Sequence, residues 1–286
     1  MGRHVLIDGD VLVYESSFGA QRNRYTVYVN GGETRTFNNA KERDAWLKPQ
    51  HLEPEAYRVE KHLDVLEEPA ALAICRNKLT ALCEKLKADS YHLYLTGKGN
   101  FREEVATLAP YKGNRADVEK PVHFAACRGW FENDKHCTVT VGQEADDAIG
   151  IASYAHWESQ ASTTTIIIAS IDKDLRQLPG NHYEWHTEAK FRISEDAADR
   201  WFWLQMLMGD KADNIPGIKG LGDVKAAKLL DGMGTRQHRA DQVTLQYIKQ
   251  YGEQWKPWAD EVGALLWIRR KPGQVWSLDA YMGGKL

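Results

Sequence analysis

Apolar positions along the first two-thirds of the chain follow two patterns that alternate with each other. Short apolar runs bounded by polar residues are typical of buried strands, whereas apolar residues at steps of three and four are typical of helices. The expected strands are residues 4–8, 91–95, 138–141 and 165–171, and the expected helices are residues 69–88, 144–157 and 197–208. This alternation predicts an α/β fold, with a largely parallel central sheet flanked by helices.

Residues 22–66 interrupt the alternation. Within them, residues 24–37 have strand-like flanks around an Asn-Gly-Gly turn, which predicts a β-hairpin. Residues 38–68 are polar, charged and weakly patterned, so we expect them to form an excursion from the core. The sequence contains no repeat and no linker rich in Gly, Ser or Pro, so a single domain over residues 1–286 is expected.

The composition limits the classes of protein to consider. The 286 residues are 43% hydrophobic and 27% charged, which is ordinary for a soluble globular protein. No apolar run approaches the ~20 residues of a membrane helix, and the first residues lack the apolar core of a signal peptide, so we expect a cytosolic protein. The four cysteines show no C-x-x-C spacing, which favours scattered reduced thiols over a zinc site.

The net charge of −3 argues against a protein that coats nucleic acid nonspecifically, because such proteins are usually basic. Carboxylates gathered at one site, however, can hide a local basic face in the overall sum. The distribution of charge along the chain is therefore more informative than its total.

Acidic residues directly follow three of the expected strands. They are Asp8 after the first strand, Glu144, Asp146 and Asp147 after the third, and Asp172 and Asp174 after the isoleucine-rich strand. The carboxyl ends of parallel strands share one edge of a sheet, and α/β proteins bind their ligands at that edge. We therefore expect these carboxylates to lie at one place.

Carboxylates that lie close together repel one another, so such a cluster indicates a bound cation. Mg²⁺ and Mn²⁺ prefer oxygen ligands, and two such ions roughly 4 Å apart can catalyse phosphodiester hydrolysis. Taken singly, each acid is more often structural; Glu144, Asp146 and Asp147 would also be favoured by the dipole of the helix that begins there. Their placement together with the acids of two other strands favours the metal site.

A segment punctuated by glycines, residues 215–230, predicts a helix–turn–helix. Glycines let the backbone approach a phosphate closely, and the helix that begins near Asp223 directs free N–H groups towards it. The residues expected to contact the DNA backbone are Gly217, Lys219, Gly220, Gly222, Lys225 and Lys228. Asp210 and Asp213 precede this segment and would point the same way in a helical turn. The alternative is an ordinary helical hairpin.

A second basic feature lies between Phe101 and Arg115. Lys112 and Arg115 are three residues apart, so on one helical face they could neutralise a scissile phosphate. Tyr111 could stack on a base. The alternative is a solvated basic patch, and these residues alone do not decide between the two.

Together, these segments resemble the flap endonuclease/5′-3′ exonuclease superfamily, and most closely its short phage 5′-3′ exonucleases. The matching segments are residues 7–9 (Ile-Asp-Gly), 101–102 (Phe-Arg), 111–115 (Tyr-Lys-Gly-Asn-Arg), 144–147 (Glu-Ala-Asp-Asp), 172–174 (Asp-Lys-Asp) and 209–217 (Gly-Asp-Lys-Ala-Asp-Asn-Ile-Pro-Gly). They occur in the family's order. Residues 22–66 and the tail after residue 235 fall outside the resemblance.

The resemblance implies a PIN-like nuclease core with a helical arch near residues 112–135 and a helix-three-turn-helix near residues 205–232. It implies a 5′-3′ exonuclease or flap endonuclease that hydrolyses DNA with two Mg²⁺ or Mn²⁺ ions. Asp8, Glu144 and Asp146 would bind the first ion, and Asp147, Asp172, Asp174, Asp210 and Asp213 would serve the second ion or its surroundings. Lys112 and Arg115 would steer the phosphate, Arg102 and Tyr111 would contact DNA, and the helix-three-turn-helix often holds a K⁺ ion.

The implied partners are DNA with free 5′ ends or 5′ single-strand/duplex junctions, and RNA primers in RNA–DNA hybrids. A role in phage or bacterial replication, in the host cytoplasm if the protein is phage-encoded, would follow from the resemblance alone. We expect a monomer that does not associate with membranes.

The chain departs from the family at one position. The family usually places an Asp after the second strand, a few residues before the Phe-Arg pair, and this position falls here at Thr96 or Gly97. Asp10 or a water molecule could compensate for the missing carboxylate. Otherwise the chain would be a structure-specific DNA-binding protein with weak or no nuclease activity, which is the alternative function.

Two further hypotheses stay open. A PIN-type ribonuclease is a third candidate, but residues 215–230 argue against it because that class lacks a helix-three-turn-helix. The expected hairpin could contact DNA through Arg22, Arg24 and Arg35, bind a replication partner, or only pack against the rest of the chain.

Overall fold

The computed structural model describes residues 2–51, 53–115, 118–159 and 163–284. The chain forms two compact units. Unit 1 comprises Met1–Val11, Leu82–Val118 and Lys135–Leu286, and unit 2 comprises Leu12–Ala81 and Glu119–Asp134. Helices α1 (Gly9–Gly19) and α3 (Glu68–Leu86) contribute residues to both units.

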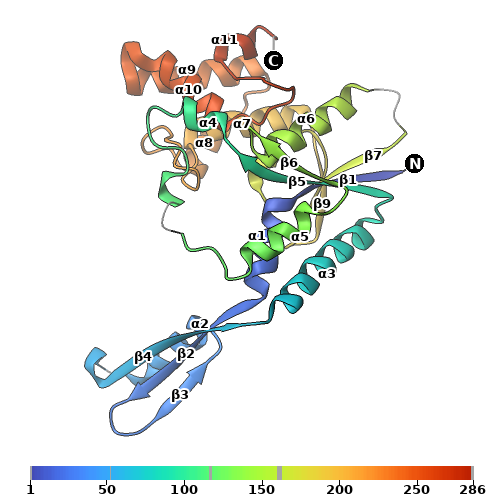
Figure 1. Cartoon of the computed structure of the whole chain (residues 1–286). Coiled ribbons are helices and arrows are strands. Elements are labelled where there is room, and N and C mark those ends of the chain that lie inside the picture. Colours follow the sequence, from blue (N-terminus) through green and yellow to red (C-terminus); the bar gives the residue numbers. More distant parts are fainter. Residues whose placement is uncertain (1, 52, 116–117, 160–162, 285–286) are drawn as a thin grey trace. The chain divides into compact units, whose positions relative to one another are not determined.

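Unit 1 is built on a six-stranded sheet with the strand order β6-β5-β1-β7-β8-β9 (Figure 1). The strands are β1 (Arg3–Asp8), β5 (Ser90–Lys98), β6 (Cys137–Val141), β7 (Thr165–Ala169), β8 (Gly180–Glu184) and β9 (Ala189–Ile193). Neighbouring strands are parallel except β9, which runs antiparallel to β8. The predicted α/β fold with a largely parallel sheet is therefore confirmed, and the four expected strands correspond to β1, β5, β6 and β7.

Unit 1 also contains seven helices in the described residues, and six of them lie in the second half of the chain. They are α4 (Phe101–Val105), α6 (Ala145–Glu158), α7 (Glu195–Met208), α8 (Asp223–Leu229), α9 (Arg236–Tyr251), α10 (Trp255–Leu266) and α11 (Leu278–Met282), with 3-10 turns η3 (Gly113–Arg115), η4 (Lys173–Gln177) and η5 (Gly252–Gln254). Within the described ranges, no helix combines the length and the apolar character needed to cross a membrane.

Two apolar clusters hold these elements in place. Ile149 of α6 packs against Leu6 of β1 and Ile168 of β7, and all three are almost fully buried. A larger cluster joins α7, α9 and α10 around Phe202 and Trp203. Burying each large apolar side chain contributes about 1.5–3 kcal/mol to the stability of the fold. These clusters therefore stabilise the strands whose ends carry the acids.

Unit 2 contains a three-stranded antiparallel sheet with the order β3-β2-β4. Its elements are β2 (Gln21–Val29), β3 (Thr34–Phe37), β4 (Tyr57–Val65), α2 (Ala40–Leu47), α5 (Phe124–Glu132), η1 (Lys48–Gln50) and η2 (Pro54–Ala56). The expected hairpin is formed by β2 and β3. Strand β4 was not expected, because most of its side chains are charged or partly exposed and give no apolar pattern.

Residues 210–215 do not form the expected helical turn. The Asp210 carboxylate accepts hydrogen bonds from the backbone N–H groups of Ala212 (2.7 Å) and Asp213 (3.4 Å), and Asp210 pairs with Ile215 in an isolated bridge. These bonds close a tight turn in place of a helix. Of the helix–turn–helix expected within residues 215–230, only the second helix, α8, is present; the helix that precedes the loop is α7.

Candidate active site

The acids expected at the sheet edge come from three strand ends. Asp8 is the last residue of β1 and is 3% exposed. Glu144 caps the start of α6, which follows β6, and Asp172 caps the start of η4, which follows β7. Because β1 lies between β5 and β7 in a parallel arrangement, these ends lie at the carboxyl edge of the sheet.

The pKa shifts show that these carboxylates act on one another. Burial and the charge of Asp10 raise the pKa of Asp8 to about 7. Burial, and then the charges of Asp172, Asp8 and Glu144, raise the pKa of Asp146 well above its ordinary value. Carboxylates from three strand ends are therefore close enough for their charges to interact strongly.

A second group of carboxylates adjoins the first. Burial and the charges of Asp172 and Asp210 raise the pKa of Asp174 to about 7. Burial also raises the pKa of Asp172, and the charges of Asp213 and Asp210 raise it further. The turn at residues 210–215 thus places Asp210 and Asp213 beside η4, although no helix is involved.

Lys112 and Arg115 pair with carboxylates of this cluster. Lys112 forms an ion pair with Glu144, and its Nζ lies 3.7 Å from Asp213. Arg115 forms an ion pair with Asp213 and donates from Nε to the Ala212 carbonyl at 2.9 Å. Burial alone would lower the pKa of Lys112, but Glu144 and Asp213 raise it above its ordinary value. The ammonium group therefore stays charged within the cluster.

The Tyr111 hydroxyl lies between two of these acids. It is 2.9 Å from both Glu144 Oε2 and Asp213 Oδ2, and can donate to either. Burial and the Glu144 charge raise the pKa of Tyr111, so the phenol keeps its proton. Lys112 lies 5.1 Å over its ring. The structure thus gives Tyr111 a contact with the acidic cluster that the sequence did not indicate.

Arg102 and Asp147 form a buried ion pair. Arg102 donates to the Asp147 carboxylate at 2.6 and 3.0 Å, and to the carbonyls of Leu265 and Trp267 at 2.8 and 2.7 Å. Arg102 is 3% exposed and Asp147 is 0% exposed. Burial alone would raise the pKa of Asp147, but Arg102 outweighs it and holds that pKa below its ordinary value.

The surroundings of this pair bear on the roles expected of the two residues. Arg102 is too deeply buried to reach DNA, so its expected DNA contact does not fit the structure. Both oxygens of Asp147 accept hydrogen bonds from the Arg102 guanidinium, which leaves this carboxylate poorly placed to bind a metal ion. Both residues instead join α4 and α6 to the end of α10 and to the residues that follow it.

The donor set suits a divalent cation by its chemistry. Its members are carboxylates, the oxygen ligands that Mg²⁺ and Mn²⁺ prefer. The raised pKa values of Asp8, Asp146 and Asp174 show that the negative charge at these positions is incompletely compensated. In the part of the chain that the structure describes, no three His, Cys, Asp or Glu side chains converge closely enough to form a ready-made metal site. Lys112 and Lys173 pair with Glu144 and Asp210 instead, so bound cations would compete with these ion pairs.

Gly97 has no room for the carboxylate that the family usually carries near this position. A Cβ atom at Gly97 would lie 2.0 Å from the Thr140 carbonyl oxygen and 2.9 Å from Val139 Cγ1. The register between β5 and β6 also shifts between Leu95 and Lys98. The backbone itself, and not only the sequence, therefore excludes a side chain here.

Asp10 lies close to this gap. Both of its carboxylate oxygens accept the Thr96 N–H, at 3.2 and 3.0 Å. Asp10 also raises the pKa of Asp8 through its charge. It thus brings a carboxylate next to the residue before Gly97, from the first turn of α1.

The loop between α7 and α8 borders a cavity of about 670 Å³. The lining includes three of the glycines expected to contact DNA and two lysines, namely Gly217, Gly220, Gly222, Lys173 and Lys211. The other expected contacts, Lys219, Lys225 and Lys228, are exposed on the loop and on α8. The expected contacts thus divide between the wall of a cavity and the surface beside it.

Two polar residues that the sequence analysis did not select support the cluster. Ser170 donates to Asp8 at 2.8 Å, and Gln205 donates to Asp174 at 2.7 Å. Gln205 is 1% exposed within the apolar face of α7. A single amide in an otherwise apolar stretch of helix is the sequence signal that could have identified it.

In fold, the chain is similar to solved phage nucleases. It covers 89% of the T5 D15 protein co-crystallised with metal ions, with a TM-score of 0.58, 15% identity and 92% of this chain covered. It covers 88% of the bacteriophage T5 D15 flap endonuclease in a pseudo-enzyme-product complex with DNA and metal ions, with a TM-score of 0.55, 17% identity and 92% of this chain covered. Likenesses at such identities show the fold alone.

In sequence, the chain matches curated phage enzymes over part of its length. It is 33% identical to the exonuclease of Escherichia phage T7 over 134 residues, 46% of this chain and 44% of that protein. It is 31% identical to the exodeoxyribonuclease of Enterobacteria phage T3 over 142 residues, which are 49% of this chain and 46% of that protein. The matches thus span less than half the length of these relatives, and no family model matches the chain. The resemblance to the flap endonuclease/5′-3′ exonuclease superfamily, and to phage exonucleases within it, is confirmed.

Proposed function

We propose that the chain is a divalent-metal-dependent 5′ nuclease that hydrolyses phosphodiester bonds of DNA, from a free 5′ end or at a 5′ single-strand/duplex junction. The observation that carries the proposal is the acidic edge of the sheet, where buried carboxylates from three strand ends raise one another's pKa. A fold does not gather such charges for stability, because each is destabilising without a cation. The T5 flap endonuclease, whose fold the chain shares, is seen with DNA and metal ions.

The proposed metal ligands fall into two groups. Asp8, Glu144 and Asp146 would hold one Mg²⁺ or Mn²⁺ ion, and Asp172, Asp174, Asp210 and Asp213 a second ion or its surroundings. Asp10 joins the first group because it acts on Asp8 and lies beside Thr96. Asp147 is left out because Arg102 engages both of its oxygens.

Two divalent ions, when bound, supply a water nucleophile at neutral pH and stabilise the leaving oxygen. The chain's own residues bind and orient the substrate. Lys112 and Arg115, already at the cluster, would neutralise the scissile phosphate when it replaces their present carboxylate partners. Tyr111 would keep Glu144 and Asp213 in place through its hydroxyl.

The loop before α8 is proposed to hold the duplex backbone. Its glycines line a cavity, and Lys219, Lys225 and Lys228 provide positive charge beside it. A K⁺ ion bound by loop carbonyls is part of this proposal. A helical arch over residues 112–135 is also proposed, although residues 116–117 lie outside the described residues. RNA primers in RNA–DNA hybrids are a further proposed substrate, and a monomer is the proposed state.

A 5′-labelled flap substrate tests the proposal. Cleavage is expected with Mg²⁺ or Mn²⁺ and is expected to stop with EDTA. Asp172→Ala should slow cleavage by at least about a hundredfold, because it removes a carboxylate from the proposed ligand set. Tight binding of the flap without cleavage in either metal would instead favour a structure-specific DNA-binding protein, the alternative that the lack of a carboxylate at Gly97 supports.

A further inference from the structure

Two buried glutamines connect the acidic edge of the sheet with the end of α10. Gln205 of α7 is 1% exposed and donates from Nε2 to Asp174 Oδ1 at 2.7 Å. Gln177, the last residue of η4, is fully buried and donates from Nε2 to Gln205 Oε1 at 2.8 Å and to the Leu266 carbonyl at 2.7 Å. Its Oε1 accepts the Ile268 N–H at 3.3 Å. Each polar atom of this glutamine pair therefore has a partner.

The backbone fixes which way both amides point. The nitrogen of a glutamine amide only donates and its oxygen only accepts, so a reversed amide loses its hydrogen bonds. Leu266 offers a carbonyl and Ile268 an N–H, so Gln177 satisfies both with its nitrogen towards Leu266. The same nitrogen faces Gln205, which must turn its oxygen to Gln177 and its own nitrogen to Asp174. The donor at Asp174 is thus determined by backbone groups two side chains away.

Those backbone groups lie in a part of the chain that the family resemblance does not cover. Leu266 and Ile268 come after residue 235, whereas Asp174 belongs to one of the matching segments. Leu266 is buried in the cluster around Phe202, and Ile268 in the cluster around β1 and β7. Because a hydrogen bond left unmade in such surroundings is costly, the glutamine pair has a fixed anchor. The tail of the chain therefore acts on an acid of the conserved pattern.

Asp174 needs a restraint of this kind while no cation is bound. The charges of Asp172 and Asp210 act on it, and repulsion favours turning an unrestrained carboxylate away from its neighbours. The Gln205 N–H opposes this by holding Oδ1. With Oδ1 held, Oδ2 is the oxygen that would bind a cation.

We propose that the glutamine pair positions Asp174 for the second metal ion, with Gln205 holding the carboxylate and Gln177 holding Gln205. The inference rests on the proposed function, because it takes Asp174 as a metal ligand. Gln205 and Gln177 are positioning residues and touch no substrate. Loss of such outer partners typically lowers metal affinity by about 10–100-fold.

Calorimetric titration with Mn²⁺ in the absence of DNA tests the proposal without using the nuclease activity. Asp174→Asn first identifies the Mn²⁺ ion whose binding depends on this carboxylate. Gln205→Met, which keeps the length of the side chain, should weaken the binding of that ion by at least about tenfold. Gln177→Met should weaken it by about threefold, because the Gln205 amide then points correctly for only part of the time.

A double-variant cycle separates positioning from general damage to the fold. In the Asp174→Asn background, Gln205→Met should leave the remaining Mn²⁺ binding unchanged, since the carboxylate that it positions is gone. Gln274→Met is a matched control near the anchor, because the buried Gln274 amide accepts from Trp267 Nε1 and the Arg270 N–H and contacts no acid of the cluster. It should lower the melting temperature and leave Mn²⁺ binding unchanged.

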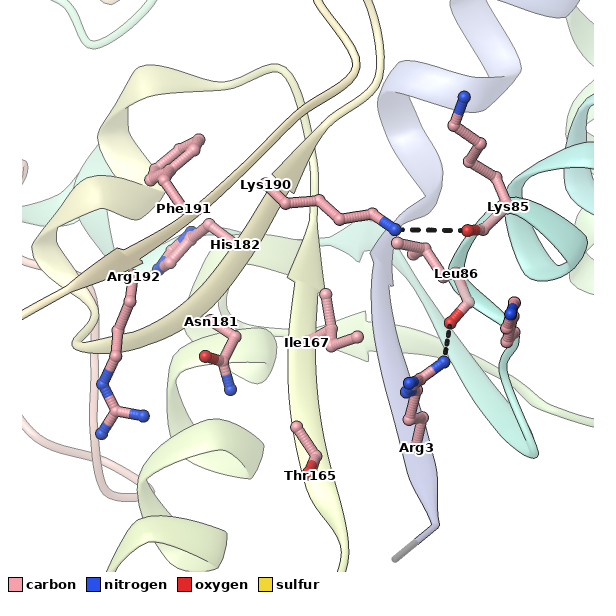
Figure 2. A pocket seen from close by; sticks show the side chains of 11 residues that line it. Arg3, Lys85, Leu86, Thr165, Ile167, Asn181, His182, Lys190, Phe191 and Arg192 are labelled. Atoms are coloured by element: carbon pink, nitrogen blue, oxygen red, sulfur yellow. Dashed lines mark hydrogen bonds between the residues drawn. The ribbon is translucent and has the colours of Figure 1, made fainter.

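Asn181 provides a second control, near the opposite end of the sheet. It is the second residue of β8 and lines the cavity of about 540 Å³ that Figure 2 shows. Its Nδ2 donates to the Ile166 carbonyl at 3.2 Å, so Asn181→Leu also removes an amide that bonds to a backbone carbonyl. This variant should bind Mn²⁺ as the native chain does.

The outcomes distinguish this proposal from the proposed function. Native Mn²⁺ affinity in Gln205→Met, or an equal loss in Gln274→Met, would overturn the role of the glutamine pair and leave the nuclease proposal standing. Mn²⁺ binding that Asp172→Ala does not change would overturn both, because the acids would then not hold the ion. Thermal melting establishes that each variant is folded. If Gln205→Met does not fold, native Mn²⁺ affinity in Gln177→Met overturns the proposal in its place.

Discussion

At the scale of single residues, Gly97 and Asp10 determine how many carboxylates the acidic edge can offer. A Cβ at Gly97 would collide with the Thr140 carbonyl at 2.0 Å, and no rotation of a side chain relieves a contact made by Cβ itself. The backbone N–H of Thr96, the residue before Gly97, donates to the Asp10 carboxylate and holds it there. The proposed first metal site therefore depends on a residue of α1 and not on β5.

The first prediction concerns this pair of residues. Gly97→Asp should destabilise the fold by about 1–3 kcal/mol, as overpacking does, and should not improve metal binding. Asp10→Asn should weaken Mn²⁺ binding, because it removes a charge beside Asp8. Chemical denaturation measures the first effect and calorimetric Mn²⁺ titration the second. Tighter Mn²⁺ binding by Gly97→Asp, or unchanged Mn²⁺ binding by Asp10→Asn, would contradict the proposal that Asp10 supplies the carboxylate that position 97 lacks.

The buried Arg102–Asp147 pair leads to a second prediction. Asp147→Asn should lower the free energy of unfolding by about 3–5 kcal/mol, because it leaves the Arg102 charge buried without its counter-ion. Asp146→Asn, its neighbour in the acidic cluster, should cause no such loss in EDTA, since it relieves repulsion. Urea denaturation of both variants makes the comparison. Equal stabilities would show that Asp147 is not structural.

The raised pKa of Asp174 gives a third prediction. In the folded chain this carboxyl holds its proton up to a pH of about 7, whereas an unfolded Asp loses it near pH 4. Its contribution to stability therefore falls as the pH rises from about 4 to about 7, and the charged form is unfavourable above that range.

Asp174→Asn should consequently raise the melting temperature in EDTA more at pH 8 than at pH 4.5. Melting curves at the two pH values measure the difference. With Mn²⁺ in excess, Asp174→Asn should instead lower the melting temperature. The native carboxylate then binds a cation that the amide binds poorly. A variant that is equally stabilised at both pH values would refute this origin of the shift.

At the scale of elements, the sequence predicted what buried apolar patterns determine. Strands β1, β5, β6 and β7 carry apolar runs, and all four were expected. Strand β8 (Gly180–Glu184) and strand β9 (Ala189–Ile193) were not, because polar residues alternate through them and pairing at the sheet edge forms them. Local hydrogen bonding could not be predicted from the sequence either. The Asp210 side chain closes a turn where the spacing of the acids predicted a helical turn.

The same distinction applies to the site. The acids could be predicted to meet because each follows a strand of a parallel sheet. The partner of Asp147 could not be predicted in this way. Arg102 is buried by the segment near Leu265 and Trp267, which lies more than a hundred residues further along the chain. Lys112 and Arg115 were expected to meet phosphate. Their present partners, Glu144 at the start of α6 and Asp213 in the turn at residues 210–215, follow only from the folded structure.

The loop between α7 and α8 supplies the fourth prediction. A Cβ on Gly217 would lie 2.2 Å from the Met208 carbonyl, whereas one on Gly222 would meet nothing within 4 Å. Gly217→Ala should therefore lower the free energy of unfolding by about 1–3 kcal/mol, and Gly222→Ala should change it by less than about 0.5 kcal/mol. Denaturation curves measure both. If the two variants were equally stable, the close approach of the loop to the end of α7 would be refuted.

At the scale of the whole molecule, the chain enters and leaves the three-stranded sheet of unit 2 at neighbouring points. Gln21 and Val65 are cross-strand partners at the ends of β2 and β4. Within the sheet, Arg22 and Arg24 both lie near Asp64, at 3.5 and 2.7 Å. Arg35 lies 5.6 Å over the Trp46 ring. The arginines that could contact DNA thus have partners within unit 2, Asp64 in the sheet and Trp46 in α2.

The fifth prediction follows from that arrangement. Replacing residues 22–64 by a short glycine linker should leave the rest of the chain folded, because cross-strand partners are only about 5 Å apart at their Cα atoms. Cleavage of a short flap should stay within about threefold of the native rate, since exposed paired charges contribute little. Kinetics on the flap substrate measure this. A tenfold loss of DNA affinity that an Arg22→Gln/Arg24→Gln/Arg35→Gln variant reproduces would establish a DNA contact instead.

The ion pairs of Lys112 with Glu144 and of Arg115 with Asp213 also have a thermodynamic consequence. Each pair joins a proposed phosphate ligand to a proposed metal ligand. A cation that takes over the carboxylates releases the two basic side chains, and a phosphate that takes over the basic side chains releases the carboxylates. Metal and DNA should therefore bind with positive cooperativity, each strengthening the other by the same factor. Neither ligand alone would then saturate the site at the concentrations that suffice when both are present.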